Sequence, residues 1–176
     1  MIFQSIKTSD LSEKQLKEIL KLKNTHWSFG IKSQKDWYKK NIKRSDLHNL
    51  MILNDKIVGY TFLSFRNFKI FKNKGPVINK RYILFSTFII TKKQRNFINA
   101  SKMMKFNNKV ILSKNKGSFL LCYKEKIDFY KFFGWSTLNK KNFQVVDHKH
   151  NLKGMIYNLI DHDKKDFKKY NFFYYR

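Results

Sequence analysis

Residues 85–101 read FSTFIITKKQRNFINAS, and this stretch decides the fold. Its first six residues are almost all apolar or β-branched, and they close an apolar run over 81–90 that is typical of a central strand buried on both faces. Beyond the turn, Phe97, Ala100 and Met104 recur at the spacing of a single helix face, which is expected to face the core. The sequence therefore predicts a strand, a turn and then a helix.

The turn of this unit carries positive charge. Backbone N–H groups at the start of a helix have no intrahelical partners, and the helix dipole adds partial positive charge there. Lys92, Lys93 and Arg95 lie beside them in the sequence. Such a turn suits a phosphate or pyrophosphate group, although any strand-to-helix turn in a lysine-rich chain has similar properties. The pattern alone predicts an anion site and does not name its ligand.

Further strand and helix patterns extend on both sides. A capping box at Ser12 and Gln15 opens the first helix, and a turn signal over 54–56 joins two strands into a hairpin. The predicted order is strand 2–7, a helix ending near Trp27, a helix starting at Ser33, strands 49–53 and 57–65, a loop over 67–80 with the only proline (Pro76), strand 81–90, helix 96–111, strand 118–123, helix 125–133 ended by Gly134, and strands 143–146 and 155–159. Strands that alternate with helices around one mixed sheet indicate an α/β or α+β fold.

The chain has 176 residues and a formal net charge of +26, from 38 Lys and Arg against 12 Asp and Glu. This charge favours an anionic partner such as nucleic acid, a membrane surface or a phosphorylated small molecule. The lysines are scattered, however, and Lys, Asn, Ile and Phe are common while Ala, Pro and Gly are scarce. A compositional bias accounts for the charge equally well.

A single cysteine, Cys122, excludes an internal disulfide and indicates a reducing compartment. The first residues do not resemble a secretory signal, and no apolar run approaches the ~20 residues of a membrane span. We therefore expect a cytoplasmic protein with no membrane partner. His148 and His150 lack an evident third ligand, so no metal is expected. Cys122 is expected to be a buried packing residue rather than a nucleophile.

Three segments resemble segments of the GNAT superfamily of N-acetyltransferases, and the chain resembles an uncharacterised bacterial-type member of it. Arg95 and Ala100 fit the acetyl-CoA loop Q/R-x-x-G-x-G/A, while Ile98 departs from it at a glycine. Residues 129–135, FYKFFGW, resemble the helix that follows the fifth strand in that family, and Lys56 to Tyr60 (KIVGY) resembles its first hairpin. The resemblance covers roughly residues 3–160.

The resemblance implies a single-domain GNAT-like fold, with a mixed, mostly antiparallel sheet of six to seven strands and about four helices. It implies a domain over 1–160 and a charged, aromatic tail over 161–176 that is part of this domain or flexible. Acetyl-CoA is implied as co-substrate. The residues implied to bind it are Phe88, Ile89 and Ile90 for the pantetheine and carbonyl, and Arg95, Asn96, Phe97, Ile98, Asn99, Ala100 and Ser101 for the pyrophosphate.

The resemblance also implies catalytic roles. Tyr130 matches the family tyrosine that protonates the departing CoA sulfur, although its sequence context alone, beside Phe129, Phe132 and Phe133, favours a core aromatic over a catalytic residue. No general base is obvious, because no Asp or Glu occurs between Asp55 and Glu125. His26 is the candidate base, and a water relayed through Ser86 or Thr87 is the alternative.

The function expected is acetyl transfer to the amine of a small molecule, such as an amino sugar or sugar nucleotide. The charge and the interleaved aromatic residues leave a nucleic-acid-binding module as a less favoured alternative. A GNAT domain that has lost catalysis is a third, because Ile98 crowds the approach of a pyrophosphate to the backbone. The expected oligomeric state is either a monomer or a homodimer.

Overall fold

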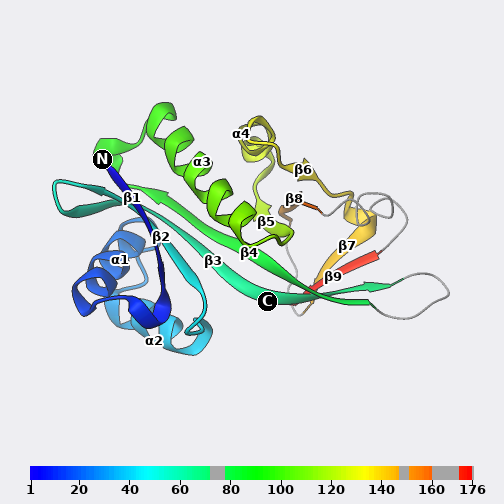
Figure 1. The fold of residues 1–176 in the computed structure, drawn as a ribbon, viewed down its shortest axis with the longest axis horizontal. Coiled ribbons are helices and arrows are strands. Elements are labelled where there is room, and N and C mark those ends of the chain that lie inside the picture. Colours follow the sequence, from blue (N-terminus) through cyan, green and yellow to red (C-terminus); the bar gives the residue numbers. More distant parts are fainter. Residues whose placement is uncertain (72–77, 147–150, 160–170, 176) are drawn as a thin grey trace. The chain divides into compact units, whose positions relative to one another are not determined.

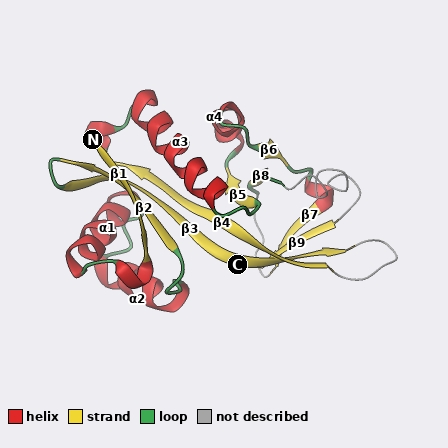
Figure 2. Ribbon diagram, viewed as in Figure 1, coloured by secondary structure: helices red, strands yellow, loops and turns green. Residues whose placement is uncertain are grey.

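The computed structural model describes residues 1–71, 78–146, 151–159 and 171–175. Helices and strands alternate through this part of the chain (Figures 1 and 2). The strands are β1 (Ile2–Lys7), β2 (Leu47–Leu53), β3 (Lys56–Phe71), β4 (Ile78–Ile90), β5 (Ser118–Cys122), β6 (Ser136–Thr137), β7 (Phe143–Val146), β8 (Lys153–Tyr157) and β9 (Asn171–Tyr175), and the helices are α1 (Glu13–His26), α2 (Ile31–Asn41), α3 (Phe97–Ser113) and α4 (Ile127–Phe132).

The described strands form one sheet. Their hydrogen-bonded order is β1-β2-β3-β4-β5-β8-β6, and β9 pairs with both β3 and β7. The pairs β1–β2, β2–β3, β3–β9, β5–β8 and β6–β8 are antiparallel, whereas β4–β5 and β7–β9 are parallel. This mixed, mostly antiparallel sheet with its four helices confirms the predicted α+β class.

Two compact units divide the chain. Unit 1 comprises residues 1–64 and 86–110, and unit 2 comprises residues 65–85 and 111–176. The single domain expected over 1–160 stays a prediction.

Two local sequence signals in unit 1 are confirmed. The backbone N–H of Gln15 donates to Ser12 Oγ at 3.2 Å, and the Ser12 N–H donates to Gln15 Oε1 at 3.0 Å. This reciprocal capping box fixes the start of α1. Between β2 and β3, Asn54 and Asp55 have φ angles of 48° and 58°. Asn and Asp tolerate this left-handed region, which the tight two-residue hairpin turn requires.

The strands of unit 1 carry a separate small core on each face. Leu50 packs with Ile19 and Leu22 of α1, whereas its neighbour Met51 packs with Met103 of α3. Successive strand side chains point to opposite faces of the sheet, so β2 serves both cores. In Figure 1, α1 and α2 accordingly lie on one face of these strands and α3 lies on the other.

Aromatic side chains dominate the core of unit 2. The rings of Phe119 and Tyr174 stack with centroids 3.8 Å apart and planes 10° apart. Tyr82 contacts Tyr174 edge-on at 5.1 Å, and Phe68 contacts Tyr82 in the same manner at 5.6 Å. Strand β9 therefore supplies a central ring of this core through Tyr174.

The predicted start of the second helix is wrong. Helix α2 begins at Ile31, after Gly30 with a φ of 86°, and Ser33 lies inside its first turn. The Gly30 N–H donates to Asn24 Oδ1 at 2.8 Å, and the Gln34 side-chain amide donates to the Trp27 carbonyl at 2.9 Å. These bonds to the preceding turn position the helix, and the cap-like pattern at Ser33 does not.

The predicted loop over 67–80 is also wrong at both ends. Strand β3 continues to Phe71 because β9 pairs with it from Phe68 onward, and β4 already begins at Ile78. Pro76 lies outside the described residues. The tail, which the sequence left unassigned, contains β9, while residues 160–170 lie outside the described part.

No helix of the described residues is both long enough and apolar enough to cross a membrane.

Candidate active site

The predicted pantetheine-binding residues end strand β4 in unit 1. Ile89 and Ile90 are buried, and Phe88 is partly buried against the small core beneath α3. The Thr91 N–H donates to the Val58 carbonyl of β3 at 2.8 Å, which closes the strand. Because these apolar side chains belong to the cores, only their backbone can serve a ligand.

Arg95 closes the turn that follows β4. Its Nε and Nη2 atoms both donate to the Ile90 carbonyl, at 3.3 and 3.1 Å. The intervening 3₁₀ turn η2 (Lys92–Gln94) is thereby held against the end of the strand. A guanidinium has five N–H donors, so this contact leaves donors of Arg95 for an anion. Arg95 thus shapes the turn as well as adding charge.

Asparagine side chains organise the start of helix α3. Asn96 Oδ1 accepts a hydrogen bond from the Asn99 N–H at 2.9 Å, as an N-cap does. Asn99 Nδ2 donates back to the Gln94 carbonyl at 2.8 Å, and the Ala100 N–H donates to the Asn96 carbonyl at 3.0 Å. The turn and the first helical residues therefore form one hydrogen-bonded unit.

The first two residues of α3 do not face the core. Phe97 is 61% exposed and Ile98 is 64% exposed, so the predicted core position of Phe97 is wrong. The buried face of α3 begins instead at Asn99 and the partly buried Ala100, and continues with Met103 and Met104. Ser101 is half-buried, and its hydroxyl has no hydrogen-bond partner within the described residues.

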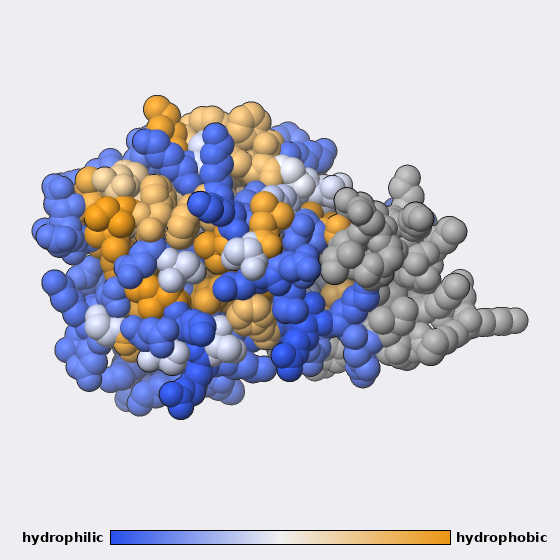
Figure 3. All heavy atoms as spheres, viewed as in Figure 1, coloured by the Kyte–Doolittle hydropathy of each residue, from blue (hydrophilic) through white to orange (hydrophobic). Residues whose placement is uncertain are grey.

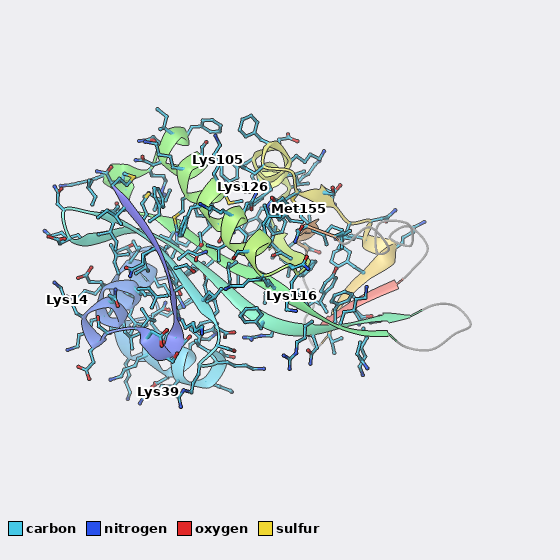
Figure 4. The ribbon with its side chains drawn as sticks, viewed as in Figure 1. Lys14, Lys39, Lys105, Lys116, Lys126 and Met155 are labelled. Atoms are coloured by element: carbon cyan, nitrogen blue, oxygen red, sulfur yellow. The ribbon has the colours of Figure 1, made fainter. Side chains whose placement is uncertain are left out.

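The charge around this turn is positive. Lys92, Lys93 and Lys102 are exposed, and no acidic residue occurs between Asp55 and Glu125. Hydrophilic residues also cover much of the face in Figure 3. Lysines are nevertheless scattered over the unit, as the labelled Lys14, Lys39 and Lys105 on α1, α2 and α3 illustrate (Figure 4). The turn is therefore distinguished by its hydrogen bonds and helix start more than by its charge.

The second candidate element, around Tyr130, lies in unit 2. The Tyr130 ring contacts Phe129, Phe85 and Trp135, with centroid separations of 5.3, 6.2 and 6.3 Å. Burial, and next the Cys122 thiol, raise the pKa of Tyr130 above its usual value. Its hydroxyl makes no hydrogen bond within the described residues. Tyr130 therefore presents a protonated hydroxyl on a ring held by aromatic contacts.

Gly134 ends the helix that carries Tyr130. Its φ of 82° is in the left-handed region, as expected for a glycine just past a helix. The Gly134 N–H donates to the Lys131 carbonyl at 2.9 Å, and the Trp135 N–H donates to the Tyr130 carbonyl at 3.2 Å. This is a Schellman motif. The motif turns the chain so that the buried Trp135 packs beside Tyr130.

Cys122 is a buried free thiol, as predicted. Burial, and next the carboxylate of Glu125, raise its pKa to about 11. The thiol therefore stays protonated near neutral pH, which does not suit a nucleophile. Its sulfur lies 3.6 Å from the Met155 sulfur, a packing contact.

His26, the predicted base, lies in the last turn of α1 in unit 1. Its ring is exposed and contacts Trp27 edge-on at 4.6 Å. The predicted relay residues Ser86 and Thr87 lie on β4, where Ser86 is exposed and Thr87 is buried.

Sequence reasoning missed a buried histidine network in unit 1. His48 on β2 is fully buried, with Nε2 3.0 Å from Thr8 Oγ1 and Nδ1 2.9 Å from the Tyr60 hydroxyl. Thr8 Oγ1 donates to the Asp46 carbonyl at 3.2 Å, so it accepts from His48 Nε2. Nδ1 then accepts from Tyr60. The signal was available, since His48 shares the inward strand face with Leu50.

Burial and the neighbouring Lys23 make the His48 site unsuitable for base catalysis. Burial, followed by the charge of Lys23, lowers the pKa of His48 to about 3. Lys23 is itself only 6% exposed, and burial lowers its pKa to about 8. Its ammonium nitrogen lies 4.0 Å from the centre of the Trp37 ring. His48 is therefore a neutral structural residue whose two ring nitrogens are both used.

Within the described residues no three His, Cys, Asp or Glu side chains gather as metal ligands. His148 and His150 lie outside that part of the chain.

Comparison with known proteins relates this arrangement to solved structures and to no sequence family. No protein-family model matches the chain, and no curated protein matches it. Escherichia coli ElaA is 18% identical, with a TM-score of 0.63, over 88% of this chain and 97% of that one. A Pseudomonas aeruginosa acyl-CoA N-acyltransferase is 13% identical, with a TM-score of 0.63, over 89% of this chain and 99% of its own.

A third similar structure is an aminoglycoside 6'-N-acetyltransferase complexed with coenzyme A. It is 9% identical, with a TM-score of 0.61, and the match covers 89% of this chain and 96% of that one. These identities are low, so they establish the fold alone. The chain has the fold of the GNAT N-acetyltransferases.

Proposed function

We propose that the protein is an acetyl-CoA-dependent N-acetyltransferase acting on the amine of a small molecule. The observation that carries the proposal is the hydrogen-bonded turn from Thr91 to Ser101, in a chain with the fold of enzymes that use acyl-CoA. Of the proteins compared above, the aminoglycoside acetyltransferase was solved with coenzyme A. The turn supports the same cofactor here.

The turn would bind the pyrophosphate of the cofactor. Asn96 caps the start of α3 and Arg95 braces the turn, so the backbone there is held ready before any ligand arrives. Preorganised N–H groups and a positive helix end favour a diphosphate. Ile98 is 64% exposed. Its side chain therefore crowds the approach of a pyrophosphate to the backbone less than its place in the motif implied. Backbone groups of Phe88, Ile89 and Ile90 would hold the pantetheine and the thioester carbonyl.

Tyr130 would act as general acid. Acetyl transfer to an amine expels the CoA thiolate, which must gain a proton. Since burial raises the pKa of Tyr130, the hydroxyl keeps its proton at neutral pH until a stronger base appears. The ring contacts with Phe85, Phe129 and Trp135 would orient it.

The acceptor amine must lose a proton before it attacks. His26 is the proposed base, because its exposed imidazole is free of the network that occupies His48. The acceptor class is an amine on a small polyhydroxylated molecule, such as an amino sugar or a sugar nucleotide. The positive surface favours acceptors that also carry a phosphate.

A panel of amines, assayed for release of free CoA thiol, tests this function. The panel holds an aminoglycoside, a free amino sugar, an amino-sugar nucleotide and a polyamine, with acetyl-CoA in each. We expect many turnovers with at least one acceptor, and acetylated amine detected by mass spectrometry. Acetyl-CoA binding without turnover on any amine would instead indicate a domain that has lost catalysis. Salt-sensitive binding to random oligonucleotides, absent from a charge-matched control protein, would favour a nucleic-acid-binding role.

A further inference from the structure

The buried face of helix α3 in unit 1 contains a polar side chain among apolar ones. Ala100 and Met103 pack against the small core beneath the helix. Asn107 follows Met103 at an interval of four residues, which places both side chains on one face of the helix, and both are 0% exposed. Burial of an amide is costly unless it is hydrogen-bonded, so the partners of Asn107 are informative.

Two neighbouring strands supply the hydrogen-bond partners of Asn107. Asn49 Nδ2 on β2 donates to Asn107 Oδ1 at 2.9 Å, and Thr61 Oγ1 on β3 donates to the same oxygen at 2.7 Å. Asn49 and Thr61 lie directly opposite each other in the β2–β3 pair, and both are 0% exposed. Asn49, Thr61 and Asn107 therefore form a buried polar cluster that joins α3 to two strands.

The polar cluster is separate from the buried histidine network. His48 precedes Asn49 and Tyr60 precedes Thr61, and successive side chains of a strand point to opposite faces of a sheet. Tyr60 packs with the core beneath α1, whereas the polar cluster contacts α3. The cluster contains no residue proposed for catalysis or for cofactor binding.

The polar cluster makes fewer hydrogen bonds than its atoms allow. Asn49 Oδ1 and Asn107 Nδ2 are buried, and neither has a hydrogen-bond partner within the described residues. A buried polar group without a partner lowers stability, and a partly satisfied cluster is less stable than an apolar core. Stability alone therefore does not account for the cluster. The best-attested use of a polar residue in an apolar interface is to fix the register of the packed elements.

The hydrogen bonds of Asn107 discriminate against other registers of α3. A shift of the helix by one turn would move Asn107 to the place of Met103, beside Met51 and Ile90. The amide would then face apolar side chains, and both strand donors would lose their acceptor. Methionine side chains adapt to irregular spaces, so Met51 and Met103 alone would accept more than one register. The polar cluster is thus the part of this interface that specifies one position of the helix.

We propose that Asn107 is a positioning residue, which fixes the register of α3 on β2 and β3 and thereby holds the start of α3 where acetyl-CoA binds. This inference rests on the proposed function, because Asn96 and Asn99 at the start of α3 organise the proposed cofactor turn. A continuous helix transmits a shift at Asn107 to that turn. Small displacements of positioned groups have large effects on their function.

Replacing the polar cluster by apolar side chains tests the proposal. The triple variant is Asn49→Leu, Thr61→Val and Asn107→Leu, in which each new side chain keeps the branched shape of the old one. Because no polar group of the cluster remains, the midpoint of urea unfolding should stay the same or rise. Calorimetric titration should nevertheless show acetyl-CoA binding weakened by about tenfold or more, since the helix loses its single register. A purely structural role would lower stability and binding together, and this result would overturn the proposal.

Single substitutions provide a graded test and a control. Thr61→Val removes one of the two bonds to Asn107 and should weaken acetyl-CoA binding by about threefold. Thr61→Ser keeps the hydroxyl and should bind as the wild type does. Met103→Leu, which alters the same face of α3 without touching a hydrogen bond, should change binding by about twofold at most. Equal binding by Thr61→Val and Thr61→Ser, or a loss in Met103→Leu as large as in the triple variant, would contradict the positioning role.

Hydrogen exchange separates this inference from the proposed function. The N–H groups of Asn99 and Ala100 both donate to Asn96 at the start of α3, and their exchange is measured without the cofactor. In the triple variant this exchange should be about tenfold faster or more. Failure of the wild type to bind acetyl-CoA would refute the proposed function, and the exchange would still decide whether the polar cluster positions α3. Unchanged exchange, or acetyl-CoA binding as tight as in the wild type, in a folded triple variant would overturn the proposal.

Discussion

Replacing Tyr130 by Phe should separate catalysis from folding. The change removes one hydroxyl that makes no hydrogen bond within the described residues, and it keeps ring contacts at 5.3 to 6.3 Å. No hydrogen bond of about 1 kcal/mol is lost there, so the free energy of unfolding should change by about 0.5 kcal/mol or less. Loss of a general acid typically lowers kcat by about 10²–10⁴-fold. The KM for acetyl-CoA should change by about twofold at most.

Free-thiol release at saturating acetyl-CoA measures kcat, and thermal unfolding measures stability. Because burial raises the pKa of Tyr130, the wild-type kcat should fall only at pH values above the ordinary tyrosine pKa of about 10. Tyr157→Phe is the matched control, since this partly buried tyrosine stacks on the same Trp135 at 5.3 Å. Its kcat should stay within about twofold of wild type. Equal losses of kcat in both variants, or parallel losses of kcat and acetyl-CoA binding in Tyr130→Phe, would refute the assignment of Tyr130 as the acid.

Three further substitutions test a helix end, a helix cap and the buried histidine. Gly134→Ala should lower the free energy of unfolding by about 1 kcal/mol, because φ there is 82°; Gly117→Ala, with no contact nearer than 3.7 Å, is the thermal-melt control. Asn96→Ala should cost about 1 kcal/mol through the lost cap and should weaken acetyl-CoA binding in calorimetry, whereas Asn96→Ser should restore both. His48 has a folded pKa of about 3, below its unfolded value of about 6.5, so the unfolded chain binds the extra proton. Urea melts should therefore show stability falling by up to about 1.4 kcal/mol per pH unit as pH drops from about 6.5 toward 3, and His48→Gln should flatten this slope; an unchanged slope would contradict the buried neutral histidine.

Signals within a few residues were readable from the sequence. The capping box at Ser12, the turn at Asn54 and Asp55 and the terminal Gly134 each depend on the conformation of one short segment. Such features follow from local hydrogen bonding and from allowed φ angles. They indicated the order of the elements, while the GNAT fold was implied by the resemblance of residues 95–100 and 129–135 to that family.

Features that depend on contacts between separate segments could not be predicted from the sequence. Strand β9 pairs with β3 through Phe68 and Tyr174. These residues are far apart in the sequence, so neither segment alone shows that it pairs with the other. The start of helix α2 depends on bonds across the preceding turn, from Gly30 to Asn24 and from Gln34 to Trp27, and these override the cap-like pattern at Ser33. Phe97 fits the apolar period of the helix yet is exposed. The period shows which residues share a helix face, but it does not show which of them have a neighbouring element to pack against.

The candidate site divides in the same way. The sequence pointed to Arg95 and Asn96 by resemblance, but their bonds to Ile90 and Asn99 needed the fold. His48 was visible only as a histidine in an apolar strand. Its bonds to Thr8 and Tyr60 form where β2, β3 and the 3₁₀ turn after β1 meet, and they explain why a buried histidine is inert here.

Calorimetric titration with acetyl-CoA tests the central claim most directly. We expect saturable one-site binding, weakened by about tenfold or more in the double variant Lys92→Glu with Lys93→Glu, because the diphosphate loses two nearby cations. The pair Lys131→Glu and Lys140→Glu, with the same change in net charge, should bind as wild type does. No binding at millimolar acetyl-CoA, or equal weakening in both pairs, would contradict the assignment of the turn after β4 as the cofactor site.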